Sequence, residues 1–215
     1  MDRNFSFAAI VEYLRAQDSF QPSIINSQQN AMPSYQDFQI DWTPGNLNLG
    51  EMLGVFTYNN IPGITSLNFR QATALVGFDI EGMSDLLTVT FPNLISVDPA
   101  RLYSSFLIVS NCPLIQAIAF PLLQQSNGGI ICETNAQLVN VSIPVFVPFN
   151  NTNILFDGCA LSAASVNHIL ARCVLNAGYN SGLINLSGGT SAAPTGQGIV
   201  DKATLIGRGV GVNTN

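Results

Sequence analysis

The sequence predicts an α/β repeat protein, an irregular right-handed solenoid with parallel β ladders and strand–helix units toward its C-terminus. The first observation is an alternating apolar run that recurs and ends each time in a proline, at Pro92, Pro121 and Pro144. These prolines are 29 and 23 residues apart. A repeat of roughly 20 to 30 residues is typical of solenoids, whose units bury their apolar faces against their neighbours. The other two observations are a second strand-like run in each unit and a C-terminal third in which helices alternate with strands.

The proline-terminated runs predict half-buried strands. Apolar and polar residues alternate in them, so successive side chains should point to opposite faces of a sheet. We expect the inward residues to be Val89, Phe91, Ile118, Phe120, Val141 and Ile143. The outward residues are then Thr88, Thr90, Ala117, Ala119, Asn140 and Ser142. Because proline has no N–H to donate, it should end each strand at a corner.

A second apolar run precedes the proline-terminated run of each unit and is bounded by Gly, Asn or Pro, as strands commonly are. These runs cover residues 77–82, 106–112, 129–135 and 153–158. Two short strands and two turns per unit predict stacked parallel ladders.

The C-terminal third predicts a change from extended returns to helical ones. Apolar residues at helical spacing predict a helix over 163–177, with Ser162 as its N-cap. A strand over 183–187 follows, then a second short helix over 198–206 and a last strand over 210–212. Strand, helix and strand in this order continue the parallel stack.

We divide the chain into an N-terminal attachment or capping segment, residues 1–50, and a repeat domain, residues 51–215. Helical spacing predicts a short helix over 4–16, and no period is visible over 17–50, which indicates an extended or irregular segment. This polar segment contains the aromatic residues Phe20, Tyr35, Phe38 and Trp42. Two interpretations stay open: the segment wraps a partner and attaches the protein to it, or it caps the open end of the solenoid.

Charge is sparse in this chain. Charged residues make up 9% of it, where about 25% is usual, and the formal net charge is −6. The basic residues are scattered, which argues against a nucleic-acid partner. We recognise no secretory signal and no apolar stretch long enough for a membrane span, so we expect folding in a cytoplasm without membrane insertion. The four cysteines lack C-x-x-C spacing, which favours small buried thiols over a zinc site.

The stretch from Ile108 to Pro121, IVSNCPLIQAIAFP, resembles the leucine-rich-repeat superfamily, in particular the coils of bacterial surface repeat proteins and receptor L-domains. The tail from Leu186 to Gly209 is similar to the strand–helix endings of bacterial and bacteriophage repeat proteins. The resemblance covers residues 60–215. It implies a leucine-rich-repeat-like solenoid and, for function, a framework for binding and scaffolding. The chain departs from a regular member because its units are uneven and Ile, Val or Phe stands at some Leu positions.

No catalytic, metal or cofactor site is predicted. His168 is the single histidine, and no G-x-S-x-G elbow accompanies it, which disfavours a Ser-His-Asp arrangement. Asp79, Glu81 and Asp85 form the densest acidic group. Asp79 and Glu81 would share one face of a strand, where paired carboxylates could serve a glycosidase or hold calcium. We interpret them as an ordinary solvated strand edge.

These observations favour a non-enzymatic structural and binding protein. We expect a bacteriophage virion component (a head fibre, decoration protein or tail appendage), made in the host cytoplasm and displayed on the virion surface as a homo-oligomer. It would attach to other virion proteins through residues 1–50. The alternative is a bacterial cell-surface adhesin or a module that recognises a host glycan or receptor. A third class, a polysaccharide-cleaving enzyme, is supported only by the acidic pairs. The candidate binding residues are the outward hydroxyls and amides Thr88, Thr90, Asn140, Ser142, Asn185 and Ser187.

Overall fold

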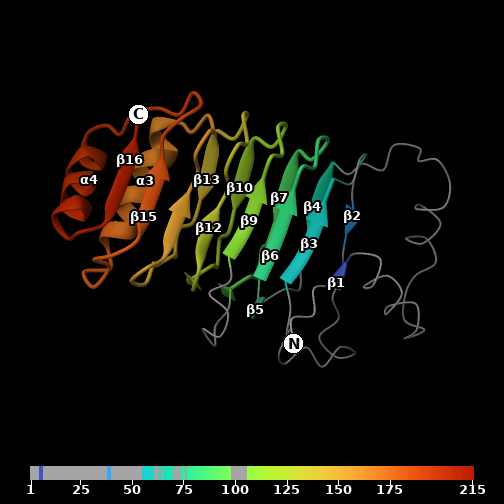
Figure 1. Ribbon diagram of the computed structural model, residues 1–215, viewed down its shortest axis with the longest axis horizontal. Helices are drawn as coiled ribbons and strands as arrows, with labels where there is room; N and C mark the ends of the chain where they lie inside the picture. Colours follow the sequence, from blue (N-terminus) through green and yellow to red (C-terminus); the bar gives the residue numbers. More distant parts are fainter. Residues whose placement is uncertain are drawn as a thin grey trace.

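The computed structural model describes residues 5–6, 38–39, 55–60, 63, 65–69, 74–75, 77–97 and 106–215. Within these residues the chain forms an α/β structure of three parallel sheets and two helices (Figure 1). The elements succeed one another along one long axis, with β2 toward one end and α4 at the other. The predicted α/β class with parallel ladders is therefore confirmed.

The longest sheet has eight strands, and every neighbouring pair in it is parallel. Its strands, in spatial order, are β1 (Phe5–Ser6), β3 (Val55–Asn59), β6 (Gly77–Glu81), β9 (Phe106–Ser110), β12 (Gly129–Ile131), β14 (Asn153–Leu155), β15 (Leu183–Leu186) and β16 (Gly211–Thr214). The spatial order follows the chain order, because the chain leaves this sheet and returns to it one strand further along each time. We call each such circuit of the chain a coil.

Two further sheets complete the coils. The five-stranded sheet contains β13 (Asn140–Ser142), β10 (Ala117–Ala119), β7 (Thr88–Thr90), β4 (Ser66–Asn68) and β2 (Phe38–Gln39). The three-stranded sheet contains β11 (Gln125–Ser126), β8 (Ser96–Val97) and β5 (Ala74–Leu75). The predicted two strands per unit therefore missed a third strand in these coils. Two-residue strands are too short to show an alternating pattern.

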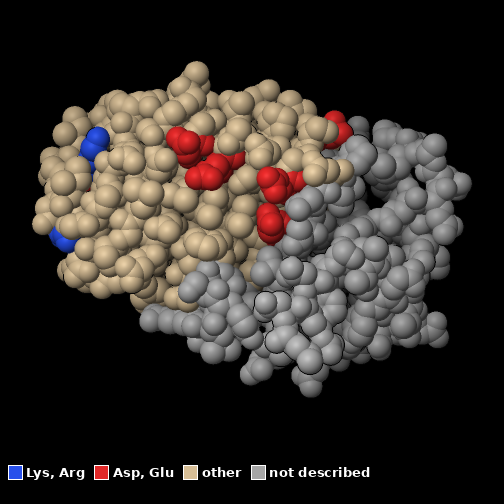
Figure 2. Space-filling view, in the orientation of Figure 1, with Lys and Arg blue, Asp and Glu red and all other residues tan. Residues whose placement is uncertain are grey.

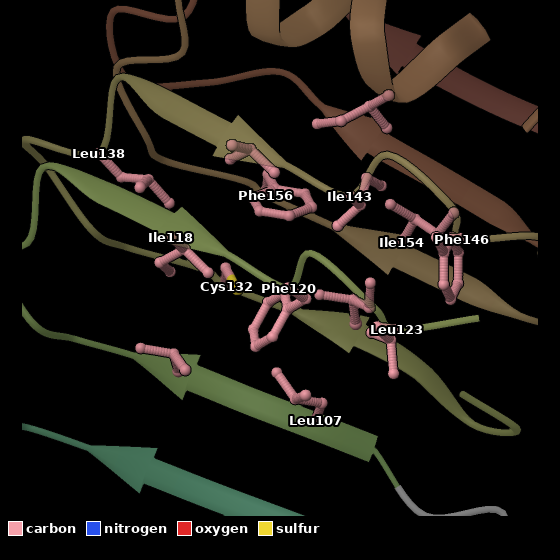
Figure 3. Packing of buried hydrophobic residues seen from close by; sticks show 14 of the residues in the cluster. Leu107, Ile118, Phe120, Leu123, Cys132, Leu138, Ile143, Phe146, Ile154 and Phe156 are labelled. Atoms are coloured by element: carbon pink, nitrogen blue, oxygen red, sulfur yellow. The ribbon is translucent and has the colours of Figure 1, made fainter. Parts of the chain in front are cut away.

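Equivalent residues of successive coils lie on top of one another in the core. Val89 pairs in register with Ile118, and the rings of Phe69 and Phe91 stack at 4.7 Å. The ring of Phe120 follows 5.4 Å from that of Phe91. The six residues predicted to point inward are all buried, whereas those predicted to point outward are exposed or, for Ala119, half-buried. Figure 3 shows Ile118, Phe120 and Ile143 in this core, together with Leu107 and Ile154 of the eight-stranded sheet and with Cys132 and Phe156, which directly follow β12 and β14.

The turn that leaves the eight-stranded sheet repeats from coil to coil. Its left-handed residues are Asn60, Gly82, Asn111, Thr134, Gly158 and Gly188. The N–H of the first five donates to a carbonyl of the next coil, as from Asn111 to Glu133 at 3.1 Å and from Thr134 to Asp157 at 2.7 Å. Asn and Gly tolerate this conformation, but it strains a β-branched residue such as Thr134.

The residue after this turn points into the core. Cys112, Asn135 and Cys159 occupy the position in three successive coils, and all three are fully buried. The amide of Asn135 accepts from Cys112 N at 2.9 Å and donates to Val109 O at 2.7 Å, so one side chain links two coils. All four cysteines are buried and free, and burial raises the pKa of Cys112 and Cys159 to about 11. The predicted buried thiols are therefore confirmed.

Helices replace the extended returns in the last coils, as predicted. Helix α3 spans Ala163–Val174, and its N-cap Ser162 accepts a hydrogen bond from Ser165 N at 3.2 Å. Helix α4 spans Gln197–Gly207. The helix predicted over 163–177 extends three residues beyond the end of α3. The guanidinium of Arg208 donates to the carbonyls of Val174 and Asn176 at this end.

The N-terminal segment contributes strands to two of the sheets. Phe5 and Ser6 form β1 on β3, so the predicted helix over 4–16 is wrong at these positions, and its other residues lie outside the described ones. Phe38 and Gln39 form β2 on β4. The unpaired backbone of an edge strand offers hydrogen bonds that outweigh a short helix's own preference. Phe20, Tyr35, Trp42 and the side chain of Phe38 lie outside the described residues. In the described part of the chain, no helix has the length and apolar character to cross a membrane.

Candidate functional site

Helix α3 closes the edge of the five-stranded sheet beside β13. In the edge strand of a parallel sheet, the N–H and C=O groups of every second residue point away from the single partner strand. The hydroxyl of Ser165 accepts from Val141 N at 3.1 Å and donates to Val139 O at 2.9 Å. One serine side chain therefore takes the place of the missing neighbour strand at this point.

His168 provides an acceptor for the next outward-pointing N–H on the edge of β13. Its Nε2 accepts a hydrogen bond from Ile143 N at 3.1 Å. A ring nitrogen that accepts carries no proton, so the neutral imidazole holds its proton on Nδ1. Burial, and then the positive charge of Arg172, lower the pKa of His168. The single histidine of the chain is therefore held neutral and fastens α3 to the sheet.

A shallow groove of about 390 Å³ lies where α3 meets the outer face of the five-stranded sheet. Ala117 and Ala119 of β10 form part of its lining, and Ala164 and His168 of α3 lie beside them. Asn140 and Ser142 of β13 contribute an amide and a hydroxyl to the same groove. None of the lining residues carries a formal charge while His168 is neutral. The groove therefore offers short apolar side chains bordered by neutral hydrogen-bonding groups.

The structure brings four of the six candidate binding residues onto one face. Thr88 and Thr90 lie on β7, and Asn140 and Ser142 lie on β13, with β10 between the two strands. The remaining two belong to the eight-stranded sheet or its turn, and the Oδ1 of Asn185 accepts from the N–H and the hydroxyl of Ser187 at 3.3 and 2.7 Å. The six residues do not form one row, because α3 occupies the place of the next strand beside β13.

Acidic side chains gather on the outer face of the eight-stranded sheet (Figure 2). Glu81 ends β6, and Glu133 and Asp157 take the equivalent positions just beyond β12 and β14. Burial, and then the charge of Glu81, raise the pKa of Asp79, whose Oδ1 has no hydrogen-bond partner in the described structure. Asp85 lies apart and accepts a backbone N–H from the preceding coil at 2.7 Å. The described residues contain no group of three or more His, Cys, Asp or Glu placed to hold a metal.

Sequence reasoning missed Ser165 and the groove that α3 forms. A signal was present, because Ser165 directly precedes Val166 on the face of the helix that carries Ile169 and Leu170. A buried polar side chain requires a partner, and the exposed edge of a sheet is the natural source of one.

Comparison with known proteins supplied no relative: no protein-family model, no curated protein and no solved structure matches the chain.

Proposed function

We propose that the chain is a non-enzymatic structural and binding protein with a leucine-rich-repeat-like right-handed solenoid. We assign it to a bacteriophage virion, as a head fibre, decoration protein or tail appendage that attaches through residues 1–50 and displays its repeats outward. The observation that carries the binding role is the uncharged outer face of the five-stranded sheet with its groove beside α3. The chain's one histidine supports the non-enzymatic assignment, because its acceptor nitrogen is already bonded to the backbone.

Three features support the solenoid assignment. Each coil returns to the eight-stranded sheet in parallel register, so each coil packs chiefly on its neighbours. The buried amide of Asn135 bonds twice to the backbone of the preceding coil and so links two successive coils. Helices α3 and α4 replace extended returns without interrupting the eight-stranded sheet.

The ligand that suits this face is neutral and rich in hydroxyl groups, as a host glycan is. Thr88, Thr90, Asn140 and Ser142 offer donors and acceptors without charge, and all four are exposed. The short side chains of Ala117 and Ala119 between them leave room for a sugar ring. The Nδ1–H of His168 adds a further donor at the wall of the groove.

A glycan array probed with the full-length chain tests this role. We expect binding that falls about tenfold or more, a loss of about 1.4 kcal/mol, in the Asn140→Ala/Ser142→Ala double variant. Ala119→Trp, which fills the groove, should lower binding as well. Asn180→Ala removes an exposed amide elsewhere and should bind as the wild type does. Unchanged binding in both groove variants would exclude this face, and an array without any bound glycan would contradict the ligand class.

Immunogold labelling of purified phage particles tests the location. We expect the label on the particle surface, and label confined to the bacterial envelope would favour the alternative of a cell-surface adhesin. Replacing Phe20, Tyr35, Phe38 and Trp42 with serine should abolish incorporation into particles if residues 1–50 attach the protein. Incorporation that survives this change would remove the N-terminal segment from the proposal.

A further inference from the structure

Helix α4 turns its apolar stripe away from the protein. Its buried residues are Gly198, Asp201 and Leu205. At 3.6 residues per turn, the opposite side of the helix carries a continuous stripe of Ile199, Val200, Ala203, Ile206 and Gly207. The three large side chains, Ile199, Val200 and Ile206, are 56, 55 and 50% exposed. A helix on the surface of a soluble protein normally has the reverse arrangement, with its apolar stripe facing the core.

The same end of the array leaves a strand edge open. Strand β16 pairs with β15 and has no neighbour on its other side among the described residues. Gly211 N donates to Gly182 O at 3.0 Å, so the N–H and C=O of Val212 point away from β15. Neither lysine nor proline guards this edge.

No charged side chain lies on the exposed stripe. Asp201 is buried, and Lys202 donates to Thr214 Oγ1 at 2.7 Å. Arg208 donates to backbone carbonyls at the end of α3. The stripe therefore offers no charge that a partner of opposite charge could bind. Two identical copies of the stripe can meet without electrostatic repulsion.

We propose that two copies of the chain associate through α4 around a two-fold axis beside Ala203. In an antiparallel helix pair centred on this residue, Val200 of one copy lies opposite Gly207 of the second copy, on the same side of the helix seam. A Cβ built on Gly207 would meet nothing within 4 Å, so the glycine leaves space for the valine. Ile199 lies opposite Ile206 of the second copy in the same register. The stripe is therefore complementary to itself in shape as well as in charge, independently of any ligand on the five-stranded sheet.

Light scattering coupled to size exclusion on the full-length chain tests the association. We expect a dimer at micromolar concentration. Gly207→Leu should raise the dissociation constant at least tenfold, because leucine fills the space for Val200 of the second copy. The melting temperature should stay the same or rise, because leucine favours the helix more than glycine does. Ile199→Glu should also give monomers. Leu122→Glu makes the same chemical change at a residue that is 45% exposed between β10 and β11, and it should leave the dimer intact.

Cross-linking tests the position of the axis. The four native cysteines are buried, so the thiol introduced by Ala203→Cys is the accessible one among the described residues. Copper phenanthroline takes two electrons from a pair of thiols, which lose two protons and form a disulfide. We expect rapid formation of a covalent dimer, and Ala136→Cys, at an exposed turn between β12 and β13, should not give it. A wild-type chain that stays monomeric, or a dimer that withstands both Gly207→Leu and Ile199→Glu, would overturn the proposal.

Discussion

One backbone conformation recurs at the residue scale, where the chain leaves the eight-stranded sheet. Five of the six left-handed residues at this turn are Gly or Asn, and the exception is Thr134 with φ 58°. The left-handed region costs a residue with a Cβ roughly 1–2 kcal/mol, and β-branching adds to the crowding. The hydrogen bond from Thr134 N to Asp157 O in the next coil holds the residue there nonetheless. Thr134 is therefore a point of strain that its neighbours lack.

We expect Thr134→Asn to raise the free energy of unfolding by about 1 kcal/mol, because asparagine tolerates this conformation better. Urea denaturation at neutral pH measures the change. Gly158→Ala is the matched control at the equivalent turn of the next coil, and it should lower the free energy by a similar amount. Its new Cβ would meet only ordinary contacts, the nearest at 3.5 Å, so that loss reports the conformation alone. A lower stability of Thr134→Asn would contradict the strain.

At the element scale, a helix and a strand are joined by side chains that replace a backbone ladder. The hydroxyl of Ser165 and the imidazole of His168 satisfy the edge of β13, and Arg172 reaches Phe146 O at 3.0 Å from the same helix. These residues are three and then four positions apart, so they share one side of α3. Because His168 must stay unprotonated to accept its bond, this junction depends on pH.

The stability that His168 contributes should fall as the pH is lowered from neutrality. Folding lowers the pKa of His168 below its ordinary value of 6.5. Between these two pKa values the unfolded chain binds more protons, so the contribution is complete above pH 6.5 and is lost toward the folded pKa. His168→Gln offers an acceptor that does not titrate. Urea midpoints of both proteins between about pH 5 and 7.5 should converge or cross as the pH falls. Parallel curves would show that His168 does not control the junction.

At the scale of the whole molecule, stacked rings couple one coil to the next. Phe91 lies 4.7 Å from Phe69, 4.8 Å from Phe78 and 5.4 Å from Phe120, measured between ring centroids. Its contacts therefore reach the preceding and the following coil. Contacts between successive coils of this kind influence how cooperatively the coils unfold.

We expect Phe91→Ala to lower the free energy of unfolding by about 3–5 kcal/mol, the usual range for loss of a buried phenylalanine. The transition should also broaden, because the coils on either side lose their coupling. Urea denaturation and amide hydrogen exchange measure the two effects. Phe106→Ala, at a half-buried position on the outer face of the eight-stranded sheet, should cost much less. Equal losses in the two variants would contradict the central role of the ring stack.

Much of the coil architecture is predictable from local patterns. The alternation around Val89, Ile118 and Val141 identifies the buried face, because the period of a strand decides which side chains share a side. Apolar spacing likewise locates α3 and α4 to within a few residues of their ends. Thr88, Thr90, Asn140 and Ser142 could be placed together on an outer face for the same reason.

The remaining features depend on contacts between coils, which no local pattern encodes. The open edge of a ladder recruits Phe5 and Ser6 into a strand, and α3 next to β13 directs Asn185 into the other sheet. The roles of Ser165 and His168 exist only because an edge strand lies beside α3. The periodicity of α4 reveals an apolar stripe, but only packing shows that this stripe faces outward. The sequence by itself determined the repeat and its inward residues, since these follow from the period of a strand. The tertiary structure alone decided which strand edges and which helix face stay uncovered, since this depends on which elements pack beside each coil.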